Sequence, residues 1–194
     1  MQGYLREDGR KGIRNIVAVV YLVECARHVA TRIGNAFDAG DVHVIGFPGC
    51  YPNDYAQTMM ERLCTHPNVG AVLLVSLGCE SFDRYGLAKF IAASGRTVHT
   101  VGIQQIGGTR VGIEGGTAWV KDTLSDLQNQ KPVPMDPSEL IIGTICGGSD
   151  GTSGLTANPA VGRAFDLLVE ENATCIFEET GELIGCEEIM ASRA

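Results

Sequence analysis

A glycine-rich loop between residues 146 and 159 carries the groups best suited to chemistry in this sequence. Its thiol, Cys146, and its carboxylate, Asp150, stand among glycines and hydroxyl side chains. Glycine lets a backbone approach a ligand closely. The loop follows an apolar run and leads into Asn158 and Pro159, a pattern typical of a helix start. A strand, a polar glycine-rich loop and a helix N-terminus together favour the binding of an anion.

The simpler alternative for this segment is an ordinary connection between a strand and a helix. Such connections usually need about 2–6 residues, and this one is longer and polar throughout. We therefore expect the loop to bind an anionic ligand through backbone amides and hydroxyl groups. The residues expected to do so are Gly147, Gly148, Gly151, Ser153 and Thr156.

Composition restricts the class of protein. The chain has 194 residues and a formal net charge of −8, which argues against nucleic acid and anionic membranes as partners because both attract basic surfaces. No apolar run approaches the ~20 residues of a membrane span, and residues 1–14 lack the apolar core of a signal peptide. We expect a cytoplasmic protein, whose seven cysteines are thiols rather than a disulfide framework.

Apolar runs of strand length alternate with amphipathic stretches of helix length. The run 69–77 is apolar nearly throughout, as expected for a strand covered on both faces of a parallel sheet. The alternation predicts the α/β class with a doubly wound, mainly parallel, Rossmann-like sheet. The predicted strands are 16–23, 42–47, 69–77 and 98–103, and the predicted helices are 24–37, 54–64, 84–93 and 116–128.

A proline-rich segment, residues 131–138, predicts a linker because three prolines interrupt both helices and strands. It separates a first domain, residues 1–130, from a second small α/β segment, residues 139–194. That segment is predicted to hold two strands, 140–145 and 174–177, around a helix at 159–171. Two strands have little core of their own. The segment therefore either docks on the first domain or begins a larger domain that this chain does not contain.

Three cysteines follow predicted strands, and ligands of open α/β sheets bind beyond the carboxyl ends of the strands. They are Cys50, Cys79 and Cys146. If these ends meet, the three thiols are suited to hold iron, zinc or an iron–sulfur cluster. The alternative is that each is a small apolar residue beside a turn.

Other polar side chains are candidates for substrate binding. Arg10 and Arg14 lie in a basic N-terminal segment, and a guanidinium group can grip a carboxylate through two hydrogen bonds. Gln104 begins a glycine-containing loop and offers an amide to a polyhydroxy ligand. The alternatives are a solvated entry to the first strand and a flexible loop.

Four stretches, spread over nearly the whole chain, resemble the altronate/galactarate dehydratase family. That family includes the large subunit of sulfolactate sulfo-lyase. The stretches are residues 3–15 (GYLREDGRKGIRN), 66–72 (HPNVGAV), 77–80 (LGCE) and 146–159 (CGGSDGTSGLTANP).

The resemblance implies a lyase that removes water from a sugar acid such as altronate or galactarate and yields a 2-keto-3-deoxy acid. The implied mechanism is metal-assisted abstraction of the α-proton followed by β-elimination. The cofactor would be a divalent metal, Fe2+ before Mn2+ or Mg2+, with an iron–sulfur cluster as the alternative. Two other readings are the sulfo-lyase large subunit, which releases sulfite, and a non-catalytic dimerisation fragment of such an enzyme.

The resemblance also assigns the domains and partners, and within it we place our candidate site residues. Residues 1–130 correspond to a middle domain used in dimer contacts, and residues 139–194 to the start of an incomplete Rossmann-like C-terminal domain. The implied partners are a small anionic sugar acid, a second copy of the chain and a separate small N-terminal-domain subunit. Catalytic roles fall on Asp150, Cys146 and Ser149, and metal binding on Cys146, Asp150, Cys79, Glu80 and Cys50.

Overall fold

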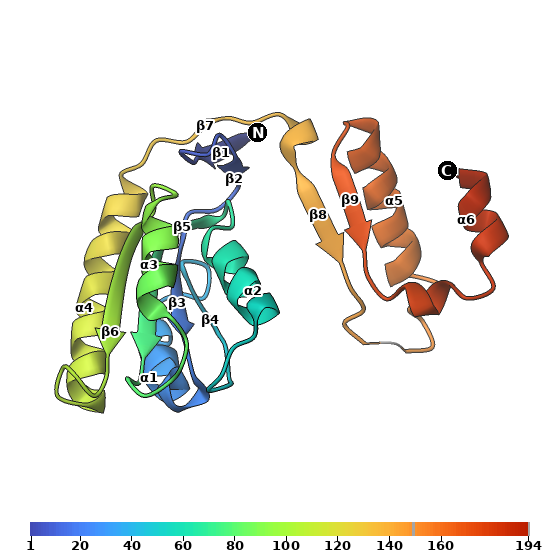
Figure 1. The fold of residues 1–194 in the computed structure, drawn as a ribbon. Coiled ribbons are helices and arrows are strands. Elements are labelled where there is room, and N and C mark those ends of the chain that lie inside the picture. Colours follow the sequence, from blue (N-terminus) through green and yellow to red (C-terminus); the bar gives the residue numbers. More distant parts are fainter. Residues whose placement is uncertain (149, 194) are drawn as a thin grey trace. The chain divides into compact units, whose positions relative to one another are not determined.

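The computed structural model describes residues 1–148 and 150–193. It divides into two compact units, residues 2–134 and residues 135–194, which are described separately (Figure 1). The division falls after Pro134, within the segment that the prolines indicated as a linker. We call these parts the first unit and the second unit.

A four-stranded parallel sheet forms the centre of the first unit. Its strands are β3 (Ile16–Tyr21), β4 (Val42–Gly46), β5 (Val69–Ser76) and β6 (Thr97–Gly102), in the order β4-β3-β5-β6. The chain runs outward from β3 to β4 and then returns across β3 to β5 and β6, so the sheet is wound in two directions. All eight residues of β5 are buried, as its apolar sequence predicted. The predicted α/β fold with a parallel sheet is confirmed.

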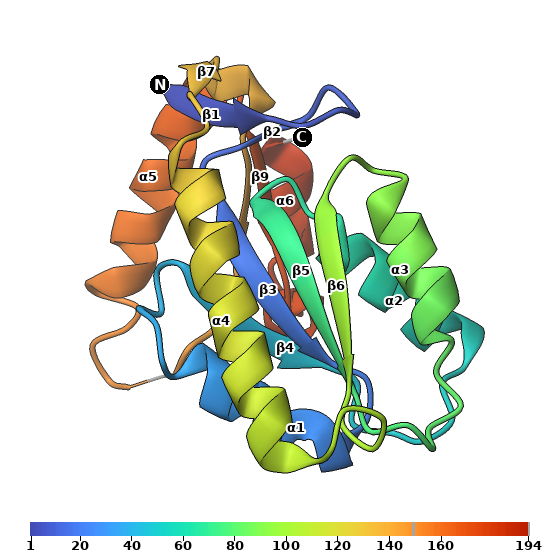
Figure 2. The same ribbon diagram turned by 90° about the vertical axis from the view of Figure 1, so that its left-hand side faces the viewer.

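Helices cover both faces of this sheet (Figure 2). Residues of α1 (Glu24–Gly34) and α4 (Thr109–Gln128) contribute to the apolar cluster on one face. Residues of α2 (Asp54–Cys64) and α3 (Arg84–Ala92) contribute to the cluster on the other. The sheet is therefore the middle layer of an α/β/α arrangement, which leaves the loops at its carboxyl ends as the natural place for a site.

Helix α4 begins at Thr109, seven positions before the predicted residue 116. The residues before 116 were predicted to form a glycine-containing loop, but Gly112 lies within the helix, and both Gly112 and Gly116 are buried. A Cβ atom on Gly116 would lie 2.4 Å from Cδ1 of Ile33 on α1. Gly116 therefore permits close packing of α4 against α1, and neither glycine interrupts the helix.

The N-terminal segment forms a small antiparallel sheet that the sequence did not predict. Strand β1 (Gln2–Leu5) pairs with β2 (Lys11–Gly12) on one side and with β7 (Val133–Pro134) on the other. Strand β7 lies within the predicted linker 131–138, so that segment is not wholly without secondary structure. Proline is tolerated here because β7 is an edge strand.

The second unit has one parallel strand pair and one long helix. Strands β8 (Ile141–Thr144) and β9 (Thr174–Phe177) are joined by α5 (Ala157–Glu170). Helix α5 starts two residues before the predicted one, and the residue before it is Thr156 rather than the predicted cap Asn158. In the described part of this unit only Met135 and Ala173 are buried hydrophobic residues. The unit also contains η1 (Pro137–Glu139), η2 (Thr180–Leu183) and α6 (Glu187–Arg193).

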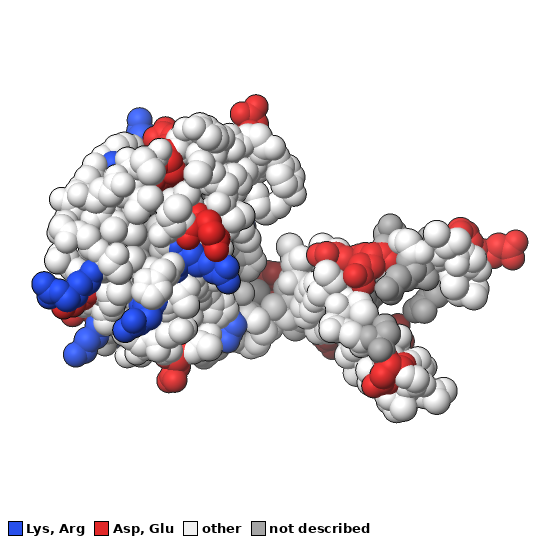
Figure 3. Space-filling model, turned by 90° about the horizontal axis from the view of Figure 1, so that it is seen from below, with Lys and Arg blue, Asp and Glu red and all other residues white. Residues whose placement is uncertain are grey.

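Charge is divided unequally between the two units. Residues 135–194 contain 11 Asp and Glu against 2 Lys and Arg, whereas residues 1–134 contain 12 against 13. Figure 3 shows basic and acidic side chains interspersed on the visible face of the first unit, and acidic ones on that of the second. The acidic excess of the chain therefore belongs to the second unit. Over the described residues, no helix is both long and apolar enough to span a membrane.

Candidate functional site

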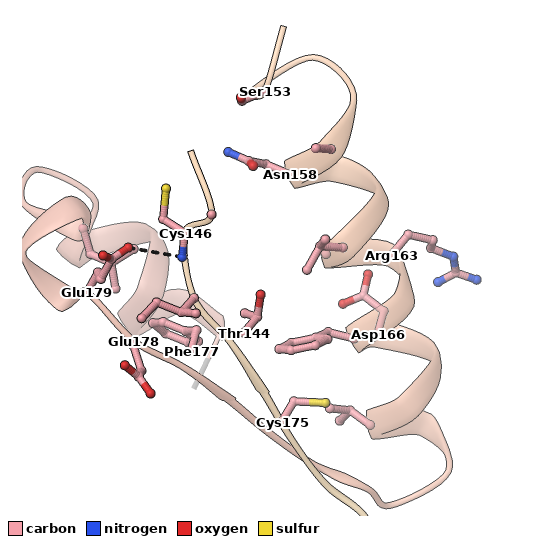
Figure 4. Close-up of a pocket in the computed structure, with 18 of the residues that line it drawn as sticks. Thr144, Cys146, Ser153, Asn158, Arg163, Asp166, Cys175, Phe177, Glu178 and Glu179 are labelled. Atoms are coloured by element: carbon pink, nitrogen blue, oxygen red, sulfur yellow. Dashed lines mark hydrogen bonds between the residues drawn. The ribbon is translucent and has the colours of Figure 1, made fainter. Parts of the chain in front are cut away.

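The second unit contains an open cavity of about 1170 Å3 at the carboxyl ends of β8 and β9 (Figure 4). One wall is the start of the glycine-rich loop, from Cys146 to Gly148, which leaves the end of β8. The opposite walls are the segment after β9 and helix α5. The polar residues among those that line the cavity include Cys146, Ser153, Asn158, Asp166, Glu178 and Glu179. The topology thus places the predicted loop at the mouth of a cavity.

A hydrogen bond joins Cys146, after β8, to Glu179, after β9. The backbone N–H of Cys146 donates to Oε2 of Glu179 at 3.3 Å (Figure 4). The backbone of Glu179 is in the left-handed region, with φ 66° and ψ 50°, which is uncommon for a residue other than glycine. An unusual backbone conformation at a cavity wall is a reason to consider a functional role.

Glu178 and Glu179 were not predicted from the sequence as site residues. The signal was present, because two acidic residues directly follow an apolar strand whose carboxyl end faces the site. This signal is weak, because acidic residues follow apolar strands in many surface segments. Only the pairing of β8 with β9 brings Glu179 to Cys146, which is 33 positions away in the chain.

Asp150 forms hydrogen bonds with residues of its own loop. Its Oδ1 accepts the backbone N–H and the hydroxyl of Thr152, each at 2.7 Å. Its backbone N–H donates to the hydroxyl of Ser153 at 3.0 Å. The hydroxyl and N–H of Thr152 lower the pKa of Asp150 below its ordinary value, so the exposed carboxylate is ionised at neutral pH. These bonds form a local turn of the kind that Asp favours.

The remaining loop residues divide into those that line the cavity and those that do not. Gly147, Gly148 and Ser153 line it. Thr156 donates its hydroxyl to the carbonyl of Thr152 at 2.9 Å and stands just before α5, and Gly151 is exposed. Ser149 lies outside the described residues.

The residues predicted as metal ligands belong to different units. Cys50, Cys79 and Glu80 are in the first, where the N–H of Ser81 donates to the carbonyl of Cys50 at 3.0 Å and joins their two loops. Cys146 and Asp150 are in the second. Within residues 1–148 and 150–193, no three His, Cys, Asp or Glu side chains gather so that they could hold a metal ion. The predicted metal therefore stays a prediction.

Glu80 is held by hydrogen bonds at the carboxyl end of β5. Its carboxylate accepts the hydroxyl of Ser76, and it accepts the N–H of Gly78 at 2.8 Å. Arg84 donates to the same Ser76 hydroxyl at 2.6 Å. Burial alone would raise the pKa of Glu80, but the bonds from Ser76 and Gly78 and the charge of Arg84 outweigh it and lower that pKa. The ionised carboxylate fixes the loop that carries Cys79.

The Glu80→Gln variant is therefore expected to lower the free energy of unfolding at neutral pH by about 1–2 kcal/mol. Hydrogen bonds to a charged group contribute about 1.5–3 kcal/mol, and the partial exposure of Glu80 weakens them. A carboxyl whose folded pKa is lowered stabilises the fold above its unfolded pKa, and this contribution is lost as pH falls through the folded pKa. The difference between wild type and variant should shrink as pH falls below the ordinary Glu range. Urea unfolding from pH 7 to pH 3, followed by fluorescence of the single tryptophan, Trp119, measures it. A difference that is independent of pH would contradict this role.

Arg10 and Arg14 are placed among structural contacts of the first unit. Arg10 forms an ion pair with Asp8 at 2.6 Å and donates to the carbonyl of Thr65 at 2.8 Å. The backbone N–H of Arg14 donates to Oδ1 of Asn68 at 3.2 Å. The N-terminal motif is therefore joined to the turn formed by residues 65–69, which we call the clamped turn.

Two buried arginines also donate hydrogen bonds to carbonyls of the clamped turn. Arg6 donates to the carbonyl of Pro67 at 2.7 Å, and Arg96 donates to the carbonyls of Thr65 and Val69, each at 2.9 Å. Burial, and then the charge of Arg96, lower the pKa of Arg6 to about 10, so it remains charged at neutral pH.

Gln104 lies in the loop after β6 and is exposed. A Cβ atom on Gly78 would lie 2.8 Å from its Oε1, so the amide rests beside the Gly78–Glu80 segment at the carboxyl ends of β5 and β6. The predicted residues Gln104, Cys79 and Glu80 thus lie at one end of the first unit's sheet.

Comparison with known proteins agrees with the division into two units. Residues 3–128 match the family model described as D-galactarate dehydratase/altronate hydrolase, second domain. Residues 137–194 match the model described as D-galactarate/altronate dehydratase, C-terminal.

Individual relatives cover nearly all of this chain. It is 31% identical to altronate dehydratase of Escherichia coli over 98% of its length and to that of Bacillus subtilis over 100%. It is 33% identical over 98% of its length to (2R)-sulfolactate sulfo-lyase subunit beta of Chromohalobacter salexigens. The chain spans 41% of each altronate dehydratase and 49% of the sulfo-lyase subunit. With both units matched in order, the chain belongs to the D-galactarate/altronate dehydratase family.

Proposed function

We propose that this chain provides two domains of a lyase that removes water from a sugar acid such as altronate or galactarate to give a 2-keto-3-deoxy acid. The observation that carries this proposal is the cavity at the ends of β8 and β9. It combines Gly147 and Gly148 of the glycine-rich loop with Cys146 and with Glu179, whose carboxylate accepts the N–H of Cys146. Family membership supplies the reaction class.

The reaction needs a base, a site for the substrate carboxylate and a proton for the leaving group. The base removes the proton α to the carboxylate, and the electron pair forms the C=C bond as the β-hydroxyl leaves. A protonated group supplies the proton that turns this hydroxyl into water, and the resulting enol rearranges to the ketone. Glu179 is our candidate for the base, and Cys146 for the proton donor. The amides of Gly147 and Gly148 line the same cavity and are suited to the substrate carboxylate.

A divalent metal would stabilise the negative charge of the enolate as a Lewis acid. Cys146, Glu178 and Glu179 are donors of suitable types, and the acidic excess of the second unit favours a cation. However, the described residues do not bring three such ligands together. We therefore assign no catalytic step to the metal.

The proposal is tested by an assay of the chain alone and of a chimera. In the chimera, the chain is followed by the part of E. coli altronate dehydratase that comes after the matched region. We expect turnover of altronate or galactarate by the chimera, supplied with Fe2+ under reducing conditions, and none by the chain alone. Glu179→Gln should lower kcat of the chimera at least about 100-fold, the scale for a general base. The control Glu114→Gln, exposed on α4, should leave it unchanged.

Sulfolactate is the second candidate substrate. The 33% identity to the sulfo-lyase subunit supports it, and the same elimination would release sulfite in place of water. Assaying the chimera on all three acids separates these candidates. An intact dimer without turnover of any of the three would contradict both and favour a dimerisation role.

A further inference from the structure

The first unit contains a polar cavity of about 390 Å3 at the amino ends of β5 and β6. Strand β1, the turn before β6 and the segment after α4 surround it (Figure 1). It therefore lies at the opposite end of the sheet from Cys79 and Glu80, which follow β5. Its volume is within the range of small-molecule sites. We call it the arginine cavity, and the charged residues that line it are Arg6, Glu7, Arg96 and Lys131.

The lining of the arginine cavity has the opposite charge to the chain as a whole. Three cationic side chains against one carboxylate give it a net charge of +2, whereas the chain carries −8. Asp8 is a further carboxylate whose charge acts on Arg6 and Arg96, but it is paired with Arg10 at 2.6 Å. Positive charge concentrated in a cavity attracts an anion.

Two of the three cations are buried, because Arg6 is 8% exposed and Arg96 is 4% exposed. Burial, and then the positive charge of Arg96, lower the pKa of Arg6, so the two guanidinium groups are close enough to repel each other. A buried charge is costly unless an opposite charge compensates it. A negative ligand in the cavity would lie against both groups and would reduce this cost.

The cavity also supplies hydrogen-bond donors. Among the described residues, three of the five N–H groups of Arg6 have acceptors, which leaves two for a ligand. Gln130 accepts the N–H of Asn15 through its Oε1 at 3.0 Å, so its amide nitrogen is the end that remains to donate. The uncharged side chains of the lining that carry donors include Tyr4, Thr97 and Gln130.

We propose that the arginine cavity binds a phosphate group, supplied either by inorganic phosphate or by the phosphate ester of a small molecule. A phosphate group carries close to two negative charges at neutral pH and offers several strong acceptor oxygens, so it matches both the net charge of +2 and the donors. Arg6 and Lys131 would supply charge-assisted hydrogen bonds. The inference does not depend on the proposed function, which places the elimination in the second unit.

Glu7 gives the proposal a distinctive consequence. Its carboxyl carbon occupies the position that a Cβ atom on Gly95 would need, so the carboxylate rests on the turn before β6 at the cavity wall. There it repels a bound anion. Removing this charge should therefore strengthen phosphate binding, whereas the loss of a residue with a purely structural role would not.

Titration calorimetry of the full chain with inorganic phosphate tests the proposal, at pH 7 and at an ionic strength held constant with sodium chloride. We expect one saturable site. Lys131→Gln should raise Kd at least about 10-fold, the scale of one hydrogen bond to a charged group. The matched control is Lys89→Gln, an exposed lysine on α3, which should leave Kd unchanged. Glu7→Gln should lower Kd by up to about 5-fold, the scale of one exposed charge.

Two further ligands define the chemistry that is recognised. Acetate, a monoanion, should bind at least about 10-fold more weakly than phosphate, because it carries one charge less. Glycerol phosphate should bind as well. Tighter binding of glycerol phosphate than of inorganic phosphate would support the proposal and make an ester the source, and equal or weaker binding would support it and make the free ion the source.

Three results would overturn the proposal. They are the absence of saturable phosphate binding, an equal effect of Lys131→Gln and Lys89→Gln, and acetate binding as tight as that of phosphate. None of these measurements requires turnover. Phosphate binding without turnover of any sugar acid by the chimera would therefore reject the proposed function alone, and turnover without phosphate binding would reject this inference alone.

Discussion

Replacement of Arg96 by methionine is expected to lower the free energy of unfolding of the first unit by about 3–5 kcal/mol. Arg96 is 4% exposed, and it donates to the carbonyls of Val69 and Thr65, each at 2.9 Å, and to the hydroxyl of Ser94 at 2.9 Å. Methionine fills similar space and donates nothing. The carbonyl of Thr65 keeps the hydrogen bond from Arg10, but the Val69 carbonyl and the Ser94 hydroxyl lose the donor that Arg96 supplies. Each buried acceptor left without a donor costs about 1–3 kcal/mol.

Urea unfolding measured by Trp119 fluorescence checks this value, because the single tryptophan lies in the first unit. The control is Arg27→Met. Arg27 pairs with Glu24 at 3.1 Å on the surface of α1, and an exposed pair of this kind adds little to stability. A loss below about 1 kcal/mol in Arg96→Met would show that the clamped turn does not need this arginine.

Gly12→Ala is expected to be the second strongly destabilising change, by about 2–4 kcal/mol, as overpacking against rigid backbone predicts. Gly12 is buried in β2. An added Cβ would lie 2.2 Å from the carbonyl oxygen of Pro67 and 2.8 Å from the nitrogen of Asn68. Both atoms belong to the backbone of the clamped turn, whose carbonyls are held by arginines, so the clash cannot be relieved by rotating a side chain.

Gly40→Ala is the matched control for this substitution. Nothing lies within 4 Å of a Cβ at Gly40, so the same change should alter stability by less than about 0.5 kcal/mol. Thermal and urea unfolding of both variants measure the difference. Equal stability of the two variants would mean that the β2 hairpin moves freely against the clamped turn.

The structure gives the N-terminal motif a structural role. Arg10 and Arg14 were predicted to bind a substrate carboxylate, and this stays a prediction. In the structure, Arg6 and Arg10 donate to carbonyls of the clamped turn, which lies in a second motif, residues 66–72, and just before it. The two motifs therefore contact each other, which is a structural reason for both to occur in one chain.

Strong local signals allowed several elements to be predicted from sequence. Helix α2 has the predicted bounds, 54–64, and its cap Asn53 accepts the N–H of Ala56 at 2.8 Å. Strand β9 also has its predicted bounds, 174–177. The short strands β1, β2 and β7 were missed, because two to four residues are too few for an alternating pattern. The start of α4 was missed because its glycines resemble a loop until the neighbouring helix is known.

The candidate site, too, was predicted from the sequence only in part. The sequence by itself determined the family motifs, the parallel arrangement of apolar strands and the position of the glycine-rich loop after a strand, because these depend on residue types close together in the chain. Only the tertiary structure decided which hydrogen bonds the site residues form. Glu179 accepts the N–H of Cys146, and Asp150 accepts the N–H of Thr152 in its own turn. Arg6 donates to the carbonyl of Pro67, 61 positions away. The physical reason is that a donor's role depends on which acceptor reaches it, and distant acceptors are brought within reach by the packing of the sheet.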